Sequence, residues 1–281
     1  MTIINAIIIG LVQGISEFLP ISSTAHLTYI GTLLGMIDKN HPEQWTSFIA
    51  VIQLGTLIAV LYYFRTDLDK IIRAFLHDNF GINKIKKIKM QSSDSKMFWY
   101  IFLGSVPIFT IGFIFKKLIE SSITKDIISI SWMAIIFGLL LGFSEKSAKL
   151  KRDLSKLSLW DSVIIGISQC FALFPGASRS GTTMTAGLFL GLNRESSARF
   201  SFLLGIPSVF AAAILEFYQS IKFMNTNTYI VYSVATAVAA ISGFFAIKYL
   251  LFYLKNHSNY IFVIYRVLLG IIALGLIYKI I

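Results

Sequence analysis

The sequence predicts an all-α integral membrane protein, built as an inverted-topology repeat with about six full spans and two re-entrant helix pairs. Three observations predict it. The 281 residues are 56% hydrophobic and 14% charged, and the mean hydropathy is +0.73. The apolar residues fall into blocks of about 17 to 25, the length that a helix needs to cross a bilayer. Lys and Arg are concentrated in two segments between these blocks. We expect residues 1–281 to form a single membrane domain.

The spans follow from the uninterrupted length of the apolar blocks. Six blocks are long enough to cross a bilayer: 46–64, 98–116, 127–143, 200–218, 229–253 and 261–279. Two further apolar segments, 2–37 and 159–192, are interrupted near the middle by Pro20 and Pro175. Proline removes a backbone donor and strains the preceding turn, so a continuous helix is not expected there. Each segment is predicted to be a pair of half-helices that enters the membrane and returns.

The basic segments predict the orientation. Residues 65–96 and 146–156 are rich in Lys and Arg, and both should be cytoplasmic loops, which can also contact anionic lipid headgroups. The net charge of +11 therefore reflects topology, and we expect no nucleic-acid partner. With this orientation, the first re-entrant pair enters from outside and the second from inside. The single cysteine, Cys170, excludes an internal disulfide and is expected to pack in a helix.

Opposite entry is typical of an inverted repeat, and a short sequence parallel supports it. Gly, Gln, Phe, Pro and Ser recur in the same order in residues 10–23 and 166–178, and Leu-Gly recurs at 54–55 and 204–205. The predicted halves are 1–143 and 144–281. They should meet at a site built from both broken segments.

The second broken segment has the composition of a phosphate cradle. A polar group in an apolar tract is costly unless it is satisfied, so such groups usually serve function. Glycines, the backbone N–H groups of a helix start and the guanidinium of Arg179 together favour an anion. The hydroxyls could instead cap or join helices, and the glycines could serve close packing. The candidate substrate-binding residues here are Gly176, Ser178, Ser180, Gly181 and Thr183.

The first broken segment adds reactive groups. Glu17 and His26 flank Ser22, Ser23 and Thr24, and a hydroxyl that attacks phosphorus needs a base that His or Glu can supply. Gln13 lies four residues before Glu17, so the two share a helix face and could hold a divalent cation, Mg²⁺ or Ca²⁺, through oxygen. Alternatively, His26 is a satisfied core residue.

Two motifs carry a specific resemblance. The stretch from Gln13 to His26 (QGISEFLPISSTAH) and residues 175–181 (PGASRSG) resemble the bacterial undecaprenyl-diphosphate phosphatase family, known also for bacitracin resistance. The resemblance covers the whole chain, including residues 104–107 and 194–195. It implies a hydrolase of the bacterial inner membrane that converts C55 isoprenyl diphosphate into undecaprenyl phosphate and phosphate. This reaction recycles the lipid carrier for peptidoglycan synthesis, and the resemblance places the site on the outer side.

The resemblance also implies roles for individual residues. Glu17 matches the acidic motif, His26 the histidine, and Ser23 the nucleophile or hydroxyl ligand, with Ser22 and Thr24 beside it. Ser178 and Arg179 match the pair that contacts phosphate. The catalytic set is thus Glu17, Ser23, His26 and Arg179, with serine, histidine or water as the nucleophile. Gln13 departs from the commonest form, which is acidic, and a glutamine has no charge to hold a cation.

A second function class fits the same architecture. Inverted repeats and broken helices also occur in transporters, which could move a lipid phosphate or a small anion. A pure carrier needs charge complementarity but not the constellation of Glu17, Ser23 and His26. Small residues at 138, 142, 187 and 191 suit close helix contacts inside the chain or, alternatively, in a homodimer.

Overall fold

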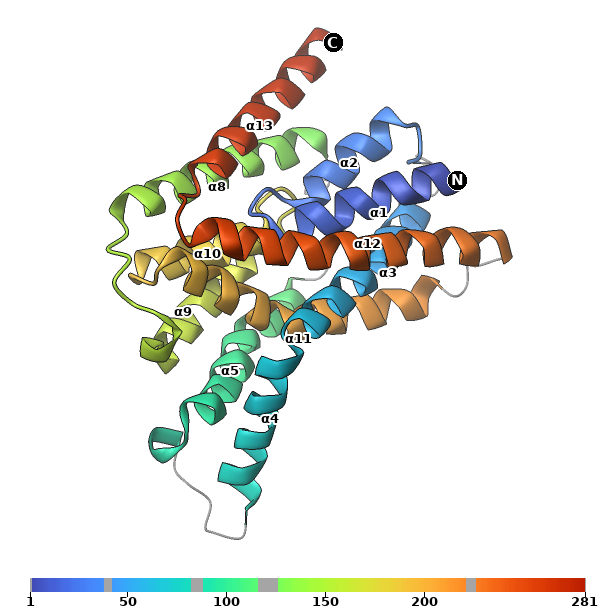
Figure 1. Cartoon of the computed structure of the whole chain (residues 1–281). Helices are drawn as coiled ribbons and strands as arrows, with labels where there is room; N and C mark the ends of the chain where they lie inside the picture. Colours follow the sequence, from blue (N-terminus) through green and yellow to red (C-terminus); the bar gives the residue numbers. More distant parts are fainter. Residues whose placement is uncertain (1, 38–41, 82–87, 116–125, 221–225, 281) are drawn as a thin grey trace.

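The computed structural model describes residues 2–37, 42–81, 88–115, 126–220 and 226–280 (Figure 1). Within these residues the backbone is almost entirely helical, and the β-type pairing is one isolated bridge between Arg152 and Leu192. Six of the described helices are long and apolar enough to cross a membrane, as predicted: Gln44–Tyr63, Ser93–Ile114, Ile127–Ser147, Arg194–Leu215, Tyr229–Leu254 and Tyr260–Tyr278.

The helices follow in chain order with short connections. They are α1 (Ile3–Phe18), α2 (Ser23–Leu33), α3 (Pro42–Tyr63), α4 (Arg65–Phe80), η1 (Ile88–Met90), α5 (Ser93–Ile114), α8 (Ile127–Ser147), η2 (Leu154–Lys156), α9 (Leu159–Gln169), η3 (Cys170–Leu173), α10 (Arg179–Phe189), α11 (Arg194–Ser220), α12 (Thr226–Leu254) and α13 (Tyr260–Ile280).

Both predicted interruptions are real. The first separates α1 from α2 at Pro20, and the second separates η3 from α10 at Pro175. Each pair returns to the end of the bundle from which it came. The start of α1 and the end of α2 share a core cluster with the start of α3, whereas residues beside the start of α9 and the end of α10 share one with the start of α11. The two re-entrant helix pairs are therefore confirmed.

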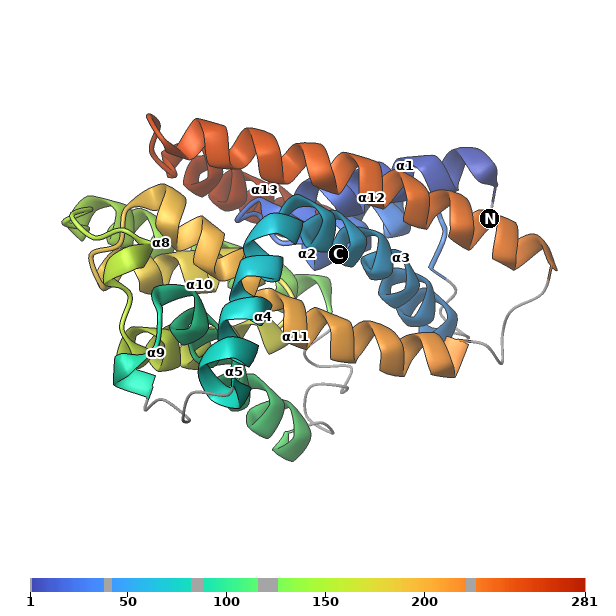
Figure 2. The ribbon, with the colours of Figure 1, turned by 60° about the horizontal axis from the view of Figure 1, so that its bottom comes forward.

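Close helix contacts explain several glycines. α1 lies along α12 (Figures 1 and 2), where a side chain at Gly14 would collide with Ser242. Gly138 and Gly142 face Arg266 and Val263 of α13 in the same way. These glycines thus serve packing within the chain. The homodimer and the inverted relation between residues 1–143 and 144–281 both stay predictions.

The basic segment after α3 is not a plain loop, as the sequence analysis had expected. It begins with α4, which projects from the bundle together with the start of α5 (Figure 1). A contact between Arg73 and Asp69, one turn apart, stabilises this helix at its exposed face. Lys84, Lys86 and Lys87 lie outside the described residues. Asp67 of α4 binds Arg199 of α11 at 2.7 Å and so fixes α4 to the bundle.

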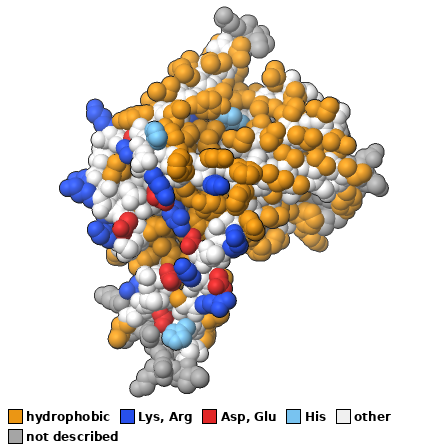
Figure 3. All heavy atoms as spheres, in the orientation of Figure 1, with side chains coloured by type: hydrophobic (Ala, Val, Ile, Leu, Met, Phe, Trp, Pro, Cys, Tyr) orange, Lys and Arg blue, Asp and Glu red, His pale blue; other side chains and the backbone are white. Residues whose placement is uncertain are grey.

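The surface matches a multi-pass membrane protein. Large apolar side chains cover the flanks of the bundle, and charged side chains gather over α4 and the neighbouring edge (Figure 3). Phe113 is 85% exposed and Phe252 is 70% exposed, although both lie in predicted spans. Such side chains require a lipid environment, because soluble monomers rarely expose apolar patches of this extent.

Candidate active site

The two broken segments meet inside the bundle, and one arginine joins them. Ser22 and Ser178, the N-caps of α2 and α10, both have positive φ angles, 73° and 70°. Arg266 of α13 is fully buried and donates to the carbonyl oxygens of Pro20 (3.2 Å), Gly176 (3.1 Å) and Ala177 (2.8 Å). A single guanidinium therefore satisfies backbone carbonyls from both interruptions, which fixes the two loops side by side.

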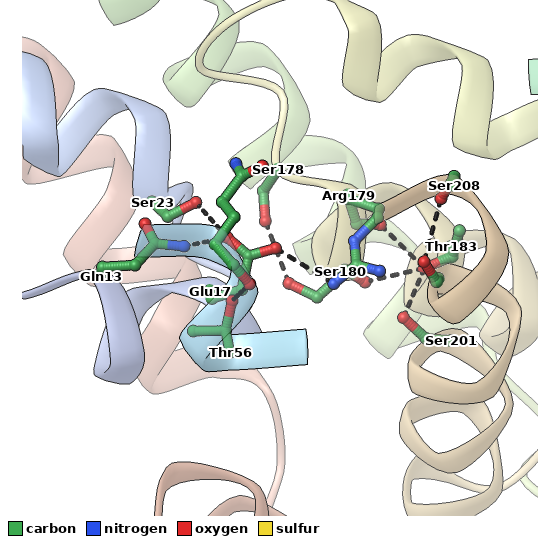
Figure 4. Close-up of polar contacts among 12 residues, drawn as sticks. Gln13, Glu17, Ser23, Thr56, Ser178, Arg179, Ser180, Thr183, Ser201 and Ser208 are labelled. Atoms are coloured by element: carbon green, nitrogen blue, oxygen red, sulfur yellow. Dashed lines mark hydrogen bonds and ion pairs between the residues drawn. The ribbon is translucent and has the colours of Figure 1, made fainter. Parts of the chain in front are cut away.

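Glu17 is the centre of the polar contacts (Figure 4). Its carboxylate accepts hydrogen bonds from Gln13 Nε2 at 3.1 Å, from Ser23 Oγ at 2.7 Å and from Arg179 Nη2 at 3.2 Å. The side chains of Glu17 and Arg179 are 8% and 14% exposed. These three contacts bring both halves of the chain to one carboxylate, as the sequence analysis expected of the site.

Arg179 occupies a space that α11 leaves open. A Cβ atom at Gly205 would fall on Arg179 Nη1 and would lie 2.5 Å from Cζ. Arg179 Nε is buried and has no hydrogen-bond partner among the described residues. The guanidinium therefore lies flat against the backbone of α11 and keeps donors for a further acceptor.

The polar groups lie at one side of a cavity of about 600 Å³. Seven of the predicted site residues line it: Glu17, Ser22, Ser23, Thr24, Gly176, Ser178 and Arg179. Its other walls are mainly apolar and come from α5, η3 and α11, for example Phe109, Phe113 and Leu215. The starts of α2 and α10 open onto the same cavity, and helix N-termini favour anions. The cavity thus combines an anion site with a greasy wall.

Three predicted residues of the second segment lie behind the cavity lining. Ser180 Oγ donates to the carbonyl oxygen of Leu19 at 3.0 Å. The Gly181 N–H donates to Ser178 Oγ at 3.1 Å, and Thr183 Oγ1 lies 2.6 Å from Ser201 Oγ. These groups support the loop that carries Ser178 and Arg179. Their contact with a substrate stays a prediction.

His26 points away from Ser23. Its Nδ1 lies 2.7 Å from the Ser22 carbonyl oxygen, and its Nε2 lies 2.7 Å from the Tyr265 hydroxyl. The ring also stacks on Tyr265, with centroids 5.5 Å apart. His26 is buried, and it is not one of the described residues that line the cavity. In this arrangement both ring nitrogens have protein partners, so its predicted catalytic role is not supported by a contact with a reactive group.

The residues present supply few ligands for a cation. Within the described parts of the chain, no group of three or more His, Cys, Asp or Glu side chains is placed to hold a metal. Gln13 is fully buried, and its Oε1 has no partner there. Glu17, Gln13 and the Ser23 hydroxyl are hard oxygen donors of the kind that Mg²⁺ and Ca²⁺ bind.

The sequence analysis missed four residues of this site. Arg266 and Gly205 position its parts, and Gln53 and Ser208 line its cavity. The signal for Arg266 was present, because a lone arginine in the apolar span 261–279 is costly unless it is buried and paired. Nothing local in the sequence distinguishes Gly205 from a packing glycine.

Comparisons with known proteins agree on one family. The model of the family described as bacitracin resistance protein BacA matches residues 6–272. A relative from Syntrophobacter fumaroxidans is 49% identical over 279 residues, which cover 99% of each chain. Relatives from Chlorobium phaeobacteroides and Chloroherpeton thalassium are 44% and 43% identical, with 97% or more of each chain covered. All three relatives are named undecaprenyl-diphosphatase.

Proposed function

This chain belongs to the bacitracin resistance protein BacA family, and we propose that it is an undecaprenyl-diphosphatase. The reaction removes the terminal phosphate of C55 isoprenyl diphosphate and returns undecaprenyl phosphate, the lipid carrier of peptidoglycan synthesis. The observation that carries the proposal is the meeting of Glu17, Ser23 and Arg179 at the polar side of a half-apolar cavity.

Binding of the diphosphate would use charge on three sides. Arg179 supplies a guanidinium, and the starts of α2 and α10 supply backbone N–H groups. Because these donors are fixed before the substrate arrives, they can stabilise the charge that develops on the phosphoryl oxygens. Arg179 would exchange part of its contact with Glu17 for the phosphate.

The chemical step would start at Ser23. Its hydroxyl, or a water that it holds, attacks the terminal phosphorus, while the hydroxyl proton passes to the Glu17 carboxylate at 2.7 Å. The new P–O bond forms as the bond to the bridging oxygen breaks, and undecaprenyl phosphate leaves. If Ser23 is the nucleophile, water then cleaves the phosphoserine and releases phosphate. The geometry favours Glu17 over His26 as proton acceptor, since Glu17 contacts the hydroxyl.

The apolar walls suit the isoprenyl tail. Phe109, Phe113 and Leu215 line the cavity and are 45%, 85% and 50% exposed, so the cavity continues to the outer flank between α5 and α11. A polyprenyl chain could thus remain in lipid while its diphosphate reaches Glu17 and Arg179.

We further propose a divalent cation, Mg²⁺ or Ca²⁺, at Glu17 and Gln13. Such an ion would neutralise phosphate charge when bound. With one carboxylate and one amide, its binding would depend heavily on the substrate's own phosphates. We also propose the bacterial inner membrane as the location, with the cavity open to the outer side, in agreement with the cytoplasmic placement of the basic segments.

The test is phosphate release from a polyprenyl diphosphate by the purified protein in detergent, where no compartments exist. Wild type should release phosphate, and Arg179→Ala should lower kcat/KM by about 10²- to 10³-fold, as for loss of a fixed donor to a reacting oxyanion. The control is Arg73→Ala, whose arginine is exposed on α4. A wild-type protein that binds the lipid but releases no phosphate would support a transporter and refute the enzyme.

A further inference from the structure

The broken first segment leaves one face of α12 without a neighbouring helix. α1 packs along α12 through Gly10 and Gly14, but it ends at Phe18, whereas α12 continues to Leu254. At this point a groove of about 620 Å³ runs between the end of α1, the last turns of α12 and the start of α13. It therefore lies where a full-length first helix would otherwise have packed.

The groove is lined almost entirely by apolar side chains. Ile15 and Leu19 line it from α1, Phe245 and Tyr249 from α12, and Phe262 from α13. Ile15 and Phe245 are 47% and 45% exposed, so the groove opens on the flank of the bundle. In a bilayer, an apolar groove on this flank gains dispersion contacts when a hydrocarbon chain fills it.

A polar pocket adjoins the groove at Tyr249, which lines both. This second pocket, of about 400 Å³, brings together three cationic side chains, Lys248, Lys255 and Arg199, and one carboxylate, Glu195. Lys255 Nζ lies 3.9 Å from Glu195, and Arg199 binds Asp67 of α4 at 2.7 Å. With both carboxylates counted, the surroundings keep a net positive charge.

The pocket lies at the headgroup level of one leaflet. It is built from the end of α3, the start of α11 and the end of α12, at the same end of the bundle as α4 and its basic residues. Lys248 and Lys255 are exposed there. Long basic side chains at the end of a span reach toward lipid phosphates.

We propose that the groove and the pocket form one site for an anionic glycerophospholipid. One acyl chain lies in the groove, and the phosphate and anionic headgroup are bound by Lys248, Lys255 and Arg199. The lipid thereby fills the half-span that α1 leaves empty and stabilises the packing of α12 against α1.

The site differs from the one that holds Glu17. Ile15 and Leu19 face the groove, whereas Gln13 and Glu17 face the opposite side of α1, toward the cavity with Arg179. The proposal is therefore independent of the phosphatase activity, and its test needs no turnover.

Native mass spectrometry of the delipidated protein tests the site. Phosphatidylglycerol should give one saturable adduct, and phosphatidylcholine should bind more weakly. The double variant Lys248→Gln/Lys255→Gln should lose on the order of tenfold in phosphatidylglycerol affinity, whereas Lys146→Gln/Lys149→Gln, which removes the same charge elsewhere at this end, should not. Equal binding of both lipids, or unchanged binding by the first variant, overturns the proposal.

A second pair of variants tests the groove without touching the charges. Ile15→Trp should fill it and reduce the phosphatidylglycerol adduct, while Ile7→Trp, on the same helix but outside the groove, should leave the adduct intact. Inorganic phosphate should not compete. Displacement of the adduct by equimolar polyprenyl phosphate would instead assign the site to the substrate or product lipid and overturn the phospholipid assignment.

Discussion

Gly205 of α11 provides the space that the guanidinium of Arg179 occupies, because a Cβ atom at this position would coincide with Nη1. The two residues come from different helices of the second half of the chain. The direction in which Arg179 faces Glu17 is thus set by a side chain that is absent.

We expect Gly205→Ala to fold and to lose activity. The end of the Arg179 side chain is flexible enough to move aside, so the structural cost is small, but the displaced guanidinium no longer faces the phosphate. Phosphate release should fall by about 10²-fold or more. Gly275→Ala is the matched control, since a Cβ there meets no atom within 4 Å. Normal kcat/KM in Gly205→Ala would show that Arg179 need not be held in this place.

Ser22 and Ser23 should respond differently to replacement by alanine. Ser23 lines the cavity and donates to Glu17, so Ser23→Ala should reduce turnover by about 10²-fold or more at unchanged stability. Ser22 Oγ caps α2 by accepting from the Ala25 N–H at 3.4 Å. Ser22→Ala should mainly lower the free energy of unfolding, by about 1 kcal/mol. Thermal unfolding and phosphate release on the same preparations separate the two effects, and equal loss of turnover in both variants would contradict the assignment.

His26 offers a test between catalysis and positioning. If its task is to hold Ser22 through Nδ1, His26→Asn should keep much of the activity, because an amide can replace that donor. His26→Phe keeps the ring but no donor, and it should be the less active of the two. If His26 is instead a general base, as the sequence analysis predicted, both variants should be equally inactive. The comparison of kcat for the two variants decides between these roles.

Arg266 should matter for stability before chemistry. Arg266→Met would leave the carbonyl oxygens of Pro20, Gly176 and Ala177 without this donor in a buried place. Each buried group left without a partner costs about 1 to 3 kcal/mol, so the melting temperature in detergent should drop clearly. Leu268→Met, at a 53% exposed position of the same helix, is the control. An Arg266→Met protein as stable as wild type would mean that the two loops are held together by other contacts.

Gln13→Glu tests the cation proposal. A second carboxylate beside Glu17 should lower the Mg²⁺ or Ca²⁺ concentration for half-maximal activity by on the order of tenfold, because hard cations prefer charged oxygen ligands. Gln13→Leu, which removes the amide oxygen, should raise that concentration. Direct binding by calorimetry in the presence of a non-hydrolysable diphosphate gives a readout without turnover. Wild-type activity that survives exhaustive chelation would exclude the cation.

Local sequence signals predicted the elements well where those signals depend on neighbours in the chain. Pro20 and Pro175 break their helices wherever these are placed, since proline lacks the N–H that a helix needs. The helical segment α4 was missed because its charges were considered only as a sign of topology. The spacing of Asp69 and Arg73, one turn apart, was a usable helix signal.

The sequence by itself determined the membrane class, the six spans, the two interruptions and the chemical types of the site residues, because apolar length and backbone restriction are properties of short segments. Only the tertiary structure decided that Glu17 pairs with Arg179, that His26 turns to Tyr265, that Gly205 makes room and that Arg266 joins both loops. Glu17 and Arg179 are 162 residues apart in the chain. Their contact depends on how whole helices pack, and no spacing within either motif encodes it.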